Sequence, residues 1–135
     1  MSAIQVLAAV IKRADRYLIC KRPPHKRHGN LWEFPGGKLE PDESLLDAAN
    51  RELQEELAVA AVKVGEPLVS FADPGSPFVI EFVPTEIRGD PTCVEHSELR
   101  WATLHEIQSL PLAPTDRQFV EFALAQRASR QPIRG

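Results

Sequence analysis

Short apolar runs separated by polar segments fill most of the chain, and this pattern predicts strands. The apolar runs at 3–11 and 17–20 flank a charged segment, so they predict a β-hairpin with its turn near Ala14 and Asp15. A turn rich in Pro, Gly and Ser is expected at 73–77. Further strands are expected at 62–64, 68–71, 78–83 and 99–102.

Two segments have helical periodicity instead. Ser44 and Asp47 approximate a capping box, which predicts a helix that begins near Ser44. A second helix is expected after Pro114, where Thr115 and Gln118 match a capping box. Because strands and helices do not alternate regularly, the fold class is expected to be α+β. The apolar face of the first helix is expected to comprise Leu46, Ala49, Leu53 and Leu57.

The last turns of the first helix concentrate negative charge. Glu52, Glu55 and Glu56 are three or four positions apart and therefore share one side of the helix. Like charges at this spacing repel, and negative charge at a helix C-terminus opposes the macrodipole. A bound divalent cation reverses both effects, and oxygen ligands suit Mg²⁺ or Mn²⁺. The alternative is a solvated acidic surface.

The segment before this helix has the composition of a ligand-binding loop. Residues 23–30 are basic and rich in helix and strand breakers, so they form either a phosphate-contacting loop or an ordinary solvated one. Pro35 restricts Phe34 to an extended conformation. The glycine pair Gly36 and Gly37 permits a tight turn and close approach of the backbone to a ligand.

Length, charge and cysteine content indicate the number of domains, the partners and the cellular environment to expect. A chain of 135 residues predicts one domain, and a net charge of -3 offers no basic surface for a stable nucleic-acid complex. Cys20 and Cys93 lack zinc-site or disulfide-scaffold spacing, which favours a reduced, cytoplasmic protein. We expect no membrane association, because no apolar run approaches membrane-spanning length.

The central stretch 37–59 resembles the Nudix box, and the preceding residues 32–38 resemble the approach to that box in the MutT-like branch of the family. Segments 95–101 and 110–116 are similar to the CTP pyrophosphohydrolase group of this branch. The expectation is a single Nudix domain over 1–135, with a tail frayed from about 128. One box position departs from the pattern, since Ala58 replaces the final glycine. The matching positions are Gly37, Glu43, Arg51, Glu52, Leu53, Glu55, Glu56 and Val59.

The resemblance implies an α/β/α sandwich with a mixed β-sheet, and hydrolysis of a nucleoside diphosphate linked to another group with Mg²⁺ or Mn²⁺. It also implies that Glu43 and Arg51 form a supporting pair. The general base stays open among Glu52, Glu55 and Glu95, because geometry decides this role. The implied metal ligands are Glu52, Glu55, Glu56 and Glu95, with the carbonyl of Gly36.

Substrate contacts are weaker expectations, each with a plain structural alternative. Phe34, Phe71 and Phe78 are candidates for stacking on a base, or core residues. Asp116 either reads the base or is a favourable charge in the first turn of a helix. Arg22 and Lys38 are candidate phosphate or base contacts, with surface roles as the alternative.

The resemblance implies a MutT-like nucleoside triphosphate pyrophosphohydrolase that acts on CTP-type or oxidised nucleotides such as 8-oxo-dGTP. One alternative within the same chemistry is hydrolysis of nucleotide sugars or dinucleoside polyphosphates. Another is a nucleotide-sensing module that binds without turnover, which the intact carboxylates disfavour. The expected partner is the nucleotide substrate, and both a monomer and a homodimer remain open.

Overall fold

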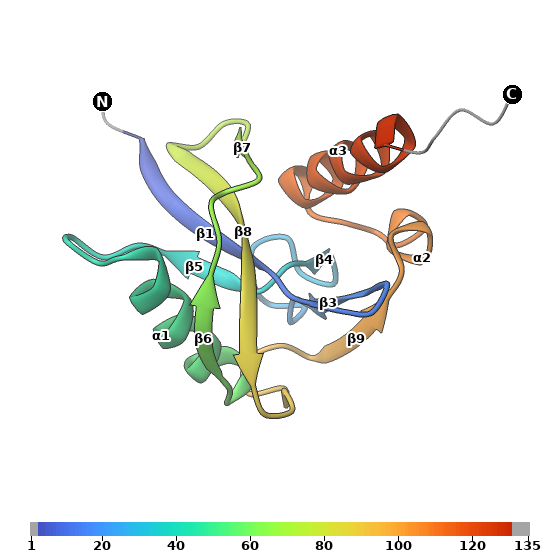
Figure 1. The fold of residues 1–135 in the computed structure, drawn as a ribbon. Helices are drawn as coiled ribbons and strands as arrows, with labels where there is room; N and C mark the ends of the chain where they lie inside the picture. Colours follow the sequence, from blue (N-terminus) through green and yellow to red (C-terminus); the bar gives the residue numbers. More distant parts are fainter. Residues whose placement is uncertain (1–2, 131–135) are drawn as a thin grey trace, which may run out of the picture.

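Two β-sheets form the centre of the protein in this computed structural model, which describes residues 3–130 (Figure 1). The first sheet is mixed, because β1 and β8 run parallel whereas its other neighbouring strands are antiparallel. It has the order β5-β1-β8-β6, with β7 also paired to β8. Its strands are β1 (Ile4–Val10), β5 (Gly36–Lys38), β6 (Ala60–Val64), β7 (Val69–Ala72) and β8 (Phe78–Arg88).

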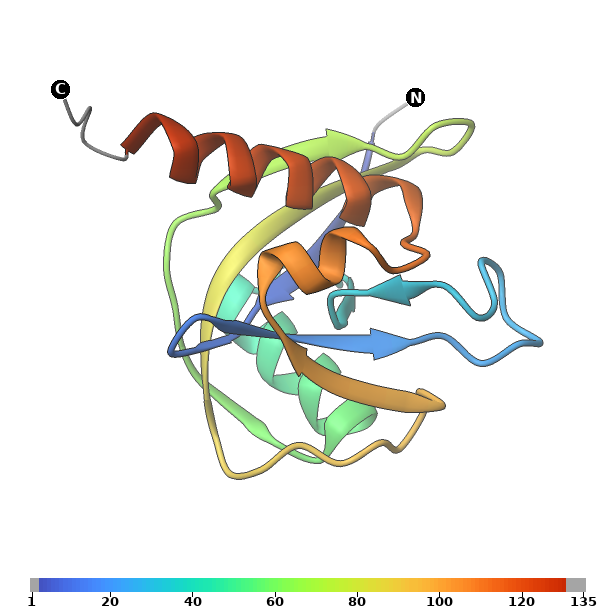
Figure 2. The ribbon, with the colours of Figure 1, turned by 90° about the vertical axis from the view of Figure 1, so that its right-hand side faces the viewer.

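The second sheet is built around β3 (Arg16–Lys21). This strand pairs antiparallel with β9 (Glu98–Ala102) on one side, and with β2 (Lys12–Arg13) and β4 (Trp32–Glu33) on the other. Figure 2 shows β3, β4 and β9 side by side, below the long C-terminal helix.

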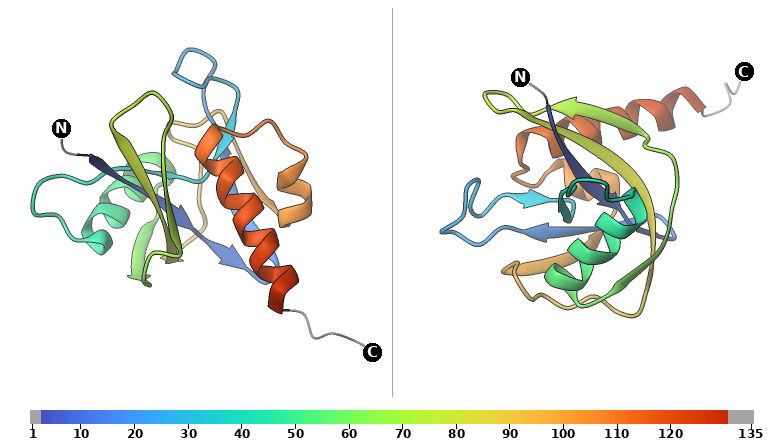
Figure 3. Two further views of the ribbon diagram at one scale, coloured as in Figure 1. Left: turned by 90° about the horizontal axis from the view of Figure 1, so that it is seen from above. Right: turned by 90° about the vertical axis from the view of Figure 1, so that its left-hand side faces the viewer.

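Helices cover both sides of the sheets (Figure 3). The helix α1 (Leu45–Leu57) lies on one side, and α2 (Leu104–Gln108) and α3 (Pro114–Arg130) lie on the other. Alternate residues of β1 supply the two cores, because successive strand side chains point to opposite faces. Leu7 and Ala9 belong to the core beneath α1, whereas Ala8 and Val10 belong to the core that contains Phe119 of α3. The expected α/β/α sandwich of class α+β is confirmed.

The expected N-terminal hairpin is only partly formed. Its turn falls at the expected place, with Ala14 at φ 53°, but only β2 pairs with β3 there. The long apolar strand β1 instead lies in the first sheet between β5 and β8. Both β1 and β3 bury residues on both faces, so each strand occupies the centre of its own sheet rather than one edge of a shared hairpin.

The helix α1 begins as expected. The hydroxyl of Ser44 accepts a hydrogen bond from the backbone N–H of Asp47 at 3.1 Å. The prediction that Leu46 belongs to the apolar face of α1 is wrong. Leu46 is exposed, and Leu45 packs against the core instead. The helix ends where Ala58 adopts the left-handed conformation, with φ 56° and ψ 37°. The chain therefore makes the turn that usually takes glycine, at a steric cost to this alanine.

The C-terminal part contains one helix that was not expected. Thr103 caps α2 through a reciprocal capping box with Glu106. Helix α3 begins at Pro114, so Thr115 lies inside the helix and the expected cap position is wrong. Proline suits the first helical position because its fixed φ is helical and its missing N–H is not needed there. Helix α3 continues through Arg130, and 131–135 of the expected frayed tail lie outside the described residues.

Within residues 3–130, no helix has the length and apolar character needed to cross a bilayer.

Candidate active site

Two carboxylates of α1 face a small cavity at the end of β5. Glu56 is buried and Glu52 is half-buried, and both line a cavity of about 150 Å³. Glu95, from the loop before β9, lines the same cavity. Glu55 is exposed and is not among the lining residues. The remaining walls come from Arg22, Pro23, Lys26, Glu33, Gly36 and His96.

The electrostatics of this cavity favour a cation. Burial raises the pKa of Glu56 to about 10, and the neighbouring carboxylates of Glu33, Glu52 and Glu95 add to this effect. Each of these groups makes the negative form of the others less favourable. A divalent cation stabilises the ionised carboxylates, and an all-oxygen donor set suits a hard ion. The residues present therefore fit the divalent metal ion that the resemblance implies.

The side chains of the two α1 carboxylates have different neighbours. In the part of the chain that the structure describes, no group of three His, Cys, Asp or Glu side chains is arranged to hold a metal ion. The side chain of Glu52 is held by Arg51, and that of Glu56 faces His96. Magnesium typically takes few protein carboxylates and completes its shell with waters and substrate phosphates.

The ion pair expected between Glu43 and Arg51 is present. The Arg51 guanidinium donates to both carboxylate oxygens of Glu43, each at 2.8 Å. It also donates to Glu52 at 2.7 Å and to the carbonyl of Lys38 at 3.0 Å. The hydrogen bond from Arg51, followed by one from the backbone of Glu40, lowers the pKa of Glu43 to about 2. Arg51 thus joins the loop after β5 to α1 and orients Glu52.

The two glycines of β5 are required for different reasons. Gly36 has φ 153°, and a Cβ there would collide with the backbone carbonyl of Leu7 on the paired strand β1. A Cβ on Gly37 would instead overlap the carboxylate of Glu52. Gly36 is therefore needed for the sheet, whereas Gly37 leaves room for a site carboxylate.

A second pocket, with a volume of about 350 Å³, adjoins the carboxylate cavity and shares Arg22, Glu33 and Gly36 with it. Its size is within the usual range for small-molecule sites. Five of the six candidate substrate contacts line this pocket, and Phe71 is the exception. The five are Arg22, Phe34, Lys38, Phe78 and Asp116.

The aromatic candidates differ in their surroundings. Phe78 is half-buried and has the Lys38 ammonium 4.9 Å from its ring centroid. Phe34 is buried, with its ring 5.2 Å from that of Phe119, so it contributes to the core as well as to the pocket wall. Phe71 packs against Phe82 and is not among the pocket-lining residues. Phe78 is thus the best placed of the three for stacking.

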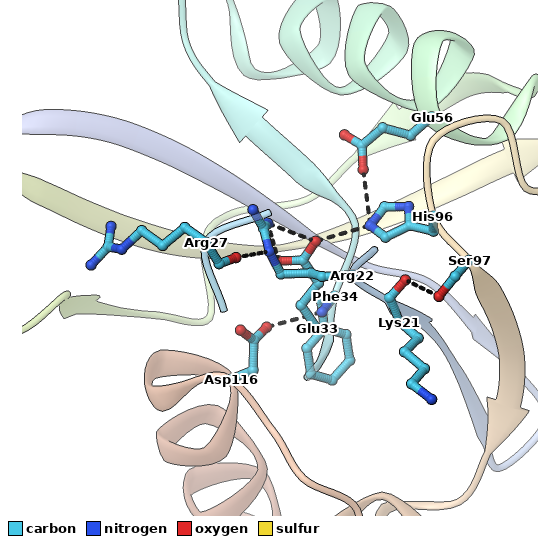
Figure 4. Close-up of polar contacts among 9 residues, drawn as sticks. All are labelled: Lys21, Arg22, Arg27, Glu33, Phe34, Glu56, His96, Ser97 and Asp116. Atoms are coloured by element: carbon cyan, nitrogen blue, oxygen red, sulfur yellow. Dashed lines mark hydrogen bonds and ion pairs between the residues drawn. The ribbon is translucent and has the colours of Figure 1, made fainter. Parts of the chain in front are cut away.

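Asp116 lies at the start of α3, at the inner end of the pocket. Its carboxylate accepts a hydrogen bond from the backbone N–H of Phe34 at 2.9 Å (Figure 4). Burial raises the pKa of Asp116 well above its usual value, and the nearby Glu33 carboxylate raises it further. A carboxyl group with a raised pKa ionises less readily, and its protonated form can both donate and accept hydrogen bonds.

Glu33 and His96 were missed by sequence reasoning. Glu33 accepts from Arg22 at 3.0 Å and lies 2.9 Å from the His96 ring (Figure 4). A signal for Glu33 was available, because alternation places it on the strand face opposite to the buried Trp32 and Phe34. His96 offered no comparable signal, since its loop has no periodicity.

The structure also separates Glu95 from Glu98, which are hard to distinguish in the sequence. Glu98 lies on β9 and pairs with Arg100 at 3.2 Å, away from the cavity. A larger apolar groove of about 700 Å³ lies beside α3, but none of the expected site residues lines it. The chemistry is therefore concentrated in the carboxylate cavity and its neighbouring pocket.

This combination of a glycine pair in β5, a carboxylate-bearing helix and a mixed-sheet sandwich defines a class of protein. Residues 1–122 match the NUDIX domain, and the chain belongs to this family and is a Nudix hydrolase. Nudix hydrolases act on nucleotide substrates.

Several known proteins are similar to this chain. A CTP pyrophosphohydrolase of Escherichia coli (strain K12) is 40% identical over 134 residues, which span 96% of this chain and 98% of that protein. An 8-oxo-dGTP diphosphatase of Proteus vulgaris is 42% identical over 57 residues, which span 42% of this chain and 51% of that protein. A MutT structure described for Aliivibrio salmonicida and Vibrio cholerae has a TM-score of 0.77 and 28% identity, and the match covers 93% of this chain and 99% of that one. The expected MutT-like affiliation is confirmed.

Proposed function

We propose that this chain is a Mg²⁺-dependent nucleoside triphosphate pyrophosphohydrolase, with Mn²⁺ as a substitute, that converts a nucleoside triphosphate and water into a nucleoside monophosphate and pyrophosphate. The observation that carries this proposal is the wall shared by the two cavities. Arg22, Glu33 and Gly36 border both the carboxylate cavity and the aromatic pocket. A nucleotide whose base lies in the pocket therefore has its phosphates beside the carboxylates of α1.

The residues of this site have different roles in the proposed reaction. Glu52, Glu55, Glu56 and Glu95, with the carbonyl of Gly36, would hold the metal, and a bound metal would supply charge neutralisation at the phosphates and a more acidic water. Glu43 and Arg51 position Glu52. A carboxylate must take the proton of the attacking water, and the candidates remain Glu52, Glu55 and Glu95. Glu52 and Glu95 line the cavity, which favours them over the exposed Glu55.

The pocket holds the nucleoside. Phe78 stacks on the base, a contact that accepts any base, and Phe34 forms the floor of the pocket. Arg22 and Lys38 face the phosphates, since both are cations that line the pocket next to the carboxylate cavity. Asp116 has a polar position suited to reading the edge of the base.

CTP-type and oxidised nucleotides such as 8-oxo-dGTP are the proposed substrates. The likeness to a CTP pyrophosphohydrolase extends over nearly the whole chain, which favours a cytosine nucleotide. The shorter likeness to an 8-oxo-dGTP diphosphatase supports the oxidised nucleotide. We further propose that the enzyme is one domain that acts in the cytoplasm, as a monomer or a homodimer.

A panel of substrates tests this function. The chain is incubated with Mg²⁺ and CTP, dCTP, dGTP, 8-oxo-dGTP, a nucleotide sugar or a dinucleoside polyphosphate, and the products are separated by chromatography. We expect a monophosphate and pyrophosphate from CTP or 8-oxo-dGTP. Release of a sugar phosphate or a longer nucleotide in preference would favour the alternative hydrolase. Tight nucleotide binding without any product would favour the sensing module.

A further inference from the structure

The His96 side chain lies at the junction of the two cavities. Its ring is 5% exposed, and its Nε2 is 2.9 Å from a carboxylate oxygen of Glu33 and 3.6 Å from one of Glu56 (Figure 4). Glu56 borders only the carboxylate cavity, whereas Glu33 borders both cavities. The imidazole thus stands between a proposed metal ligand and a wall of the nucleotide pocket.

The two contacts of Nε2 are of different kinds. At 2.9 Å, the Nε2–H group donates a hydrogen bond to Glu33, whereas 3.6 Å is too long for a hydrogen bond to Glu56. Arg22 donates to both oxygens of Glu33, at 3.0 Å and 3.2 Å. Glu33 is therefore held by both Arg22 and His96, and the His96 ring keeps the carboxyl groups of Glu33 and Glu56 apart.

A purely structural role does not account for this histidine. Its Nδ1 is buried and has no hydrogen-bond partner among the described residues. An unpaired buried nitrogen is unfavourable, and an apolar side chain of similar size would fill the space without it. The feature that an apolar residue could not supply is the donor at Nε2.

The loop that carries His96 is fixed to both walls. The backbone N–H of Val94 donates to the carbonyl of Glu56 at 2.9 Å, and the N–H of Ser97 donates to that of Lys21 at 3.0 Å. These bonds tie the loop to the end of α1 and to the end of β3. Glu95, next to His96, is carried into the carboxylate cavity by the same anchors.

We propose that His96 is a positioning residue that fixes the carboxyl groups of Glu33 and Glu56 relative to each other. The metal and the nucleotide then bind in the correct relative positions. This inference rests on the proposed function. The Nε2–H group fixes Glu33, and the bulk of the buried ring separates the carboxyl groups of Glu33 and Glu56. Loss of this donor should weaken metal binding even when no nucleotide is present.

The test compares His96→Gln with His96→Asn. A glutamine amide extends to the place of Nε2, whereas an asparagine amide reaches only as far as Nδ1, so only the first keeps the donor near Glu33. The dissociation constant of Mn²⁺ is measured by electron paramagnetic resonance without nucleotide, and kcat is measured with CTP. We expect His96→Asn to weaken Mn²⁺ binding and lower kcat by about 10- to 100-fold each, the usual range for partners that orient metal ligands. His96→Gln should stay close to the parent chain.

His105→Asn is the matched control, because His105 is exposed on α2. If His96→Asn does not fold, His96→Leu serves as the variant without a donor. Parental Mn²⁺ affinity and kcat in the variant without the donor would overturn the inference. Equal losses in the Gln variant and the donor-free variant, together with lower unfolding midpoints, would show a structural role and would also overturn it. If the parent hydrolyses no triphosphate, the proposed function fails, and the Mn²⁺ comparison still decides the role of His96.

Discussion

The carboxylate helix and the nucleotide pocket are built in opposite ways. Glu52 and Glu56 come from a single turn of α1, and Arg51 and Glu43 that support Glu52 are near neighbours in the chain. The pocket instead draws its residues from the ends of β3 and β4, from β5 and β8, and from the start of α3. One region is local in sequence, and the other exists only after folding.

This difference separates reaction from specificity. The local region supplies the charges that phosphoanhydride hydrolysis needs, and its spacing is set by the helix itself. We propose that the assembled region determines which nucleotide fits, because its residues stand on separate elements that come together only in the fold. Changes to α1 should therefore abolish turnover of every substrate, whereas changes to the pocket should alter the ranking of substrates.

The largest effect is expected for Glu56→Gln. This change removes a charge that the metal requires, and should lower kcat for all substrates on the order of 10³-fold, equivalent to a loss of several kcal/mol of transition-state stabilisation. Steady-state kinetics with CTP and 8-oxo-dGTP provide the measurement. Glu121→Gln, an exposed change on α3, is the control. A loss confined to one substrate would contradict the division between the two regions.

Asp116→Asn should change the ranking of bases. The amide retains an acceptor for the Phe34 N–H but replaces the carboxyl group that faces the pocket. We expect the ratio of kcat/KM between CTP and 8-oxo-dGTP to change by about 10- to 100-fold, the equivalent of one or two hydrogen bonds. Mn²⁺ affinity should remain that of the parent, as in the exposed control Asp90→Asn. An unchanged ratio with weaker Mn²⁺ binding would assign Asp116 to the metal site.

The paired glycines allow a smaller comparison within β5. Gly37→Ala should displace Glu52 and lower kcat about tenfold with little change in thermal stability. Gly36→Ala should instead cost about 2 kcal/mol or more of stability, because its Cβ meets the backbone of β1. Melting temperature and kcat are measured for both. If the two variants behave alike, the distinct reasons given for these glycines are wrong.

The smallest effect is expected for Ala58→Gly. Glycine removes the steric cost of the left-handed turn that ends α1, a gain of up to about 1 kcal/mol that its greater backbone freedom in the unfolded state partly offsets. Denaturant unfolding should show a modest increase in the free energy of unfolding, with kcat unchanged. A loss of stability would indicate that Ala58 makes favourable contacts that glycine cannot replace.

Much of the fold was predictable because its signals are local. The cap at Ser44 set the start of α1, and apolar runs located most strands. Strand pairing was not predictable in the same way. The segment 3–11 looked like one half of a hairpin, yet β1 pairs with strands from distant parts of the chain, since its two apolar faces must both be covered.

The same distinction applies to the site. The carboxylates of α1 were predicted through a motif with fixed spacing, whereas the pocket residues lie mostly outside that motif and were weaker expectations. Glu33 and His96 escaped prediction because their importance depends on a contact between residues 63 positions apart. The exposure of the Glu55 side chain could not be predicted from the sequence either. Helical spacing places Glu52, Glu55 and Glu56 on one side of the helix but does not determine which of them is exposed.

Identification of the products formed from CTP is the decisive test of the proposed hydrolysis. Phosphorus NMR follows CTP with Mg²⁺ and either the parent chain or Glu56→Gln. We expect CMP and pyrophosphate in equal amounts with the parent, and neither at a comparable rate with the variant. Release of CDP and inorganic phosphate, or equal pyrophosphate release by both proteins, would contradict the proposed hydrolysis.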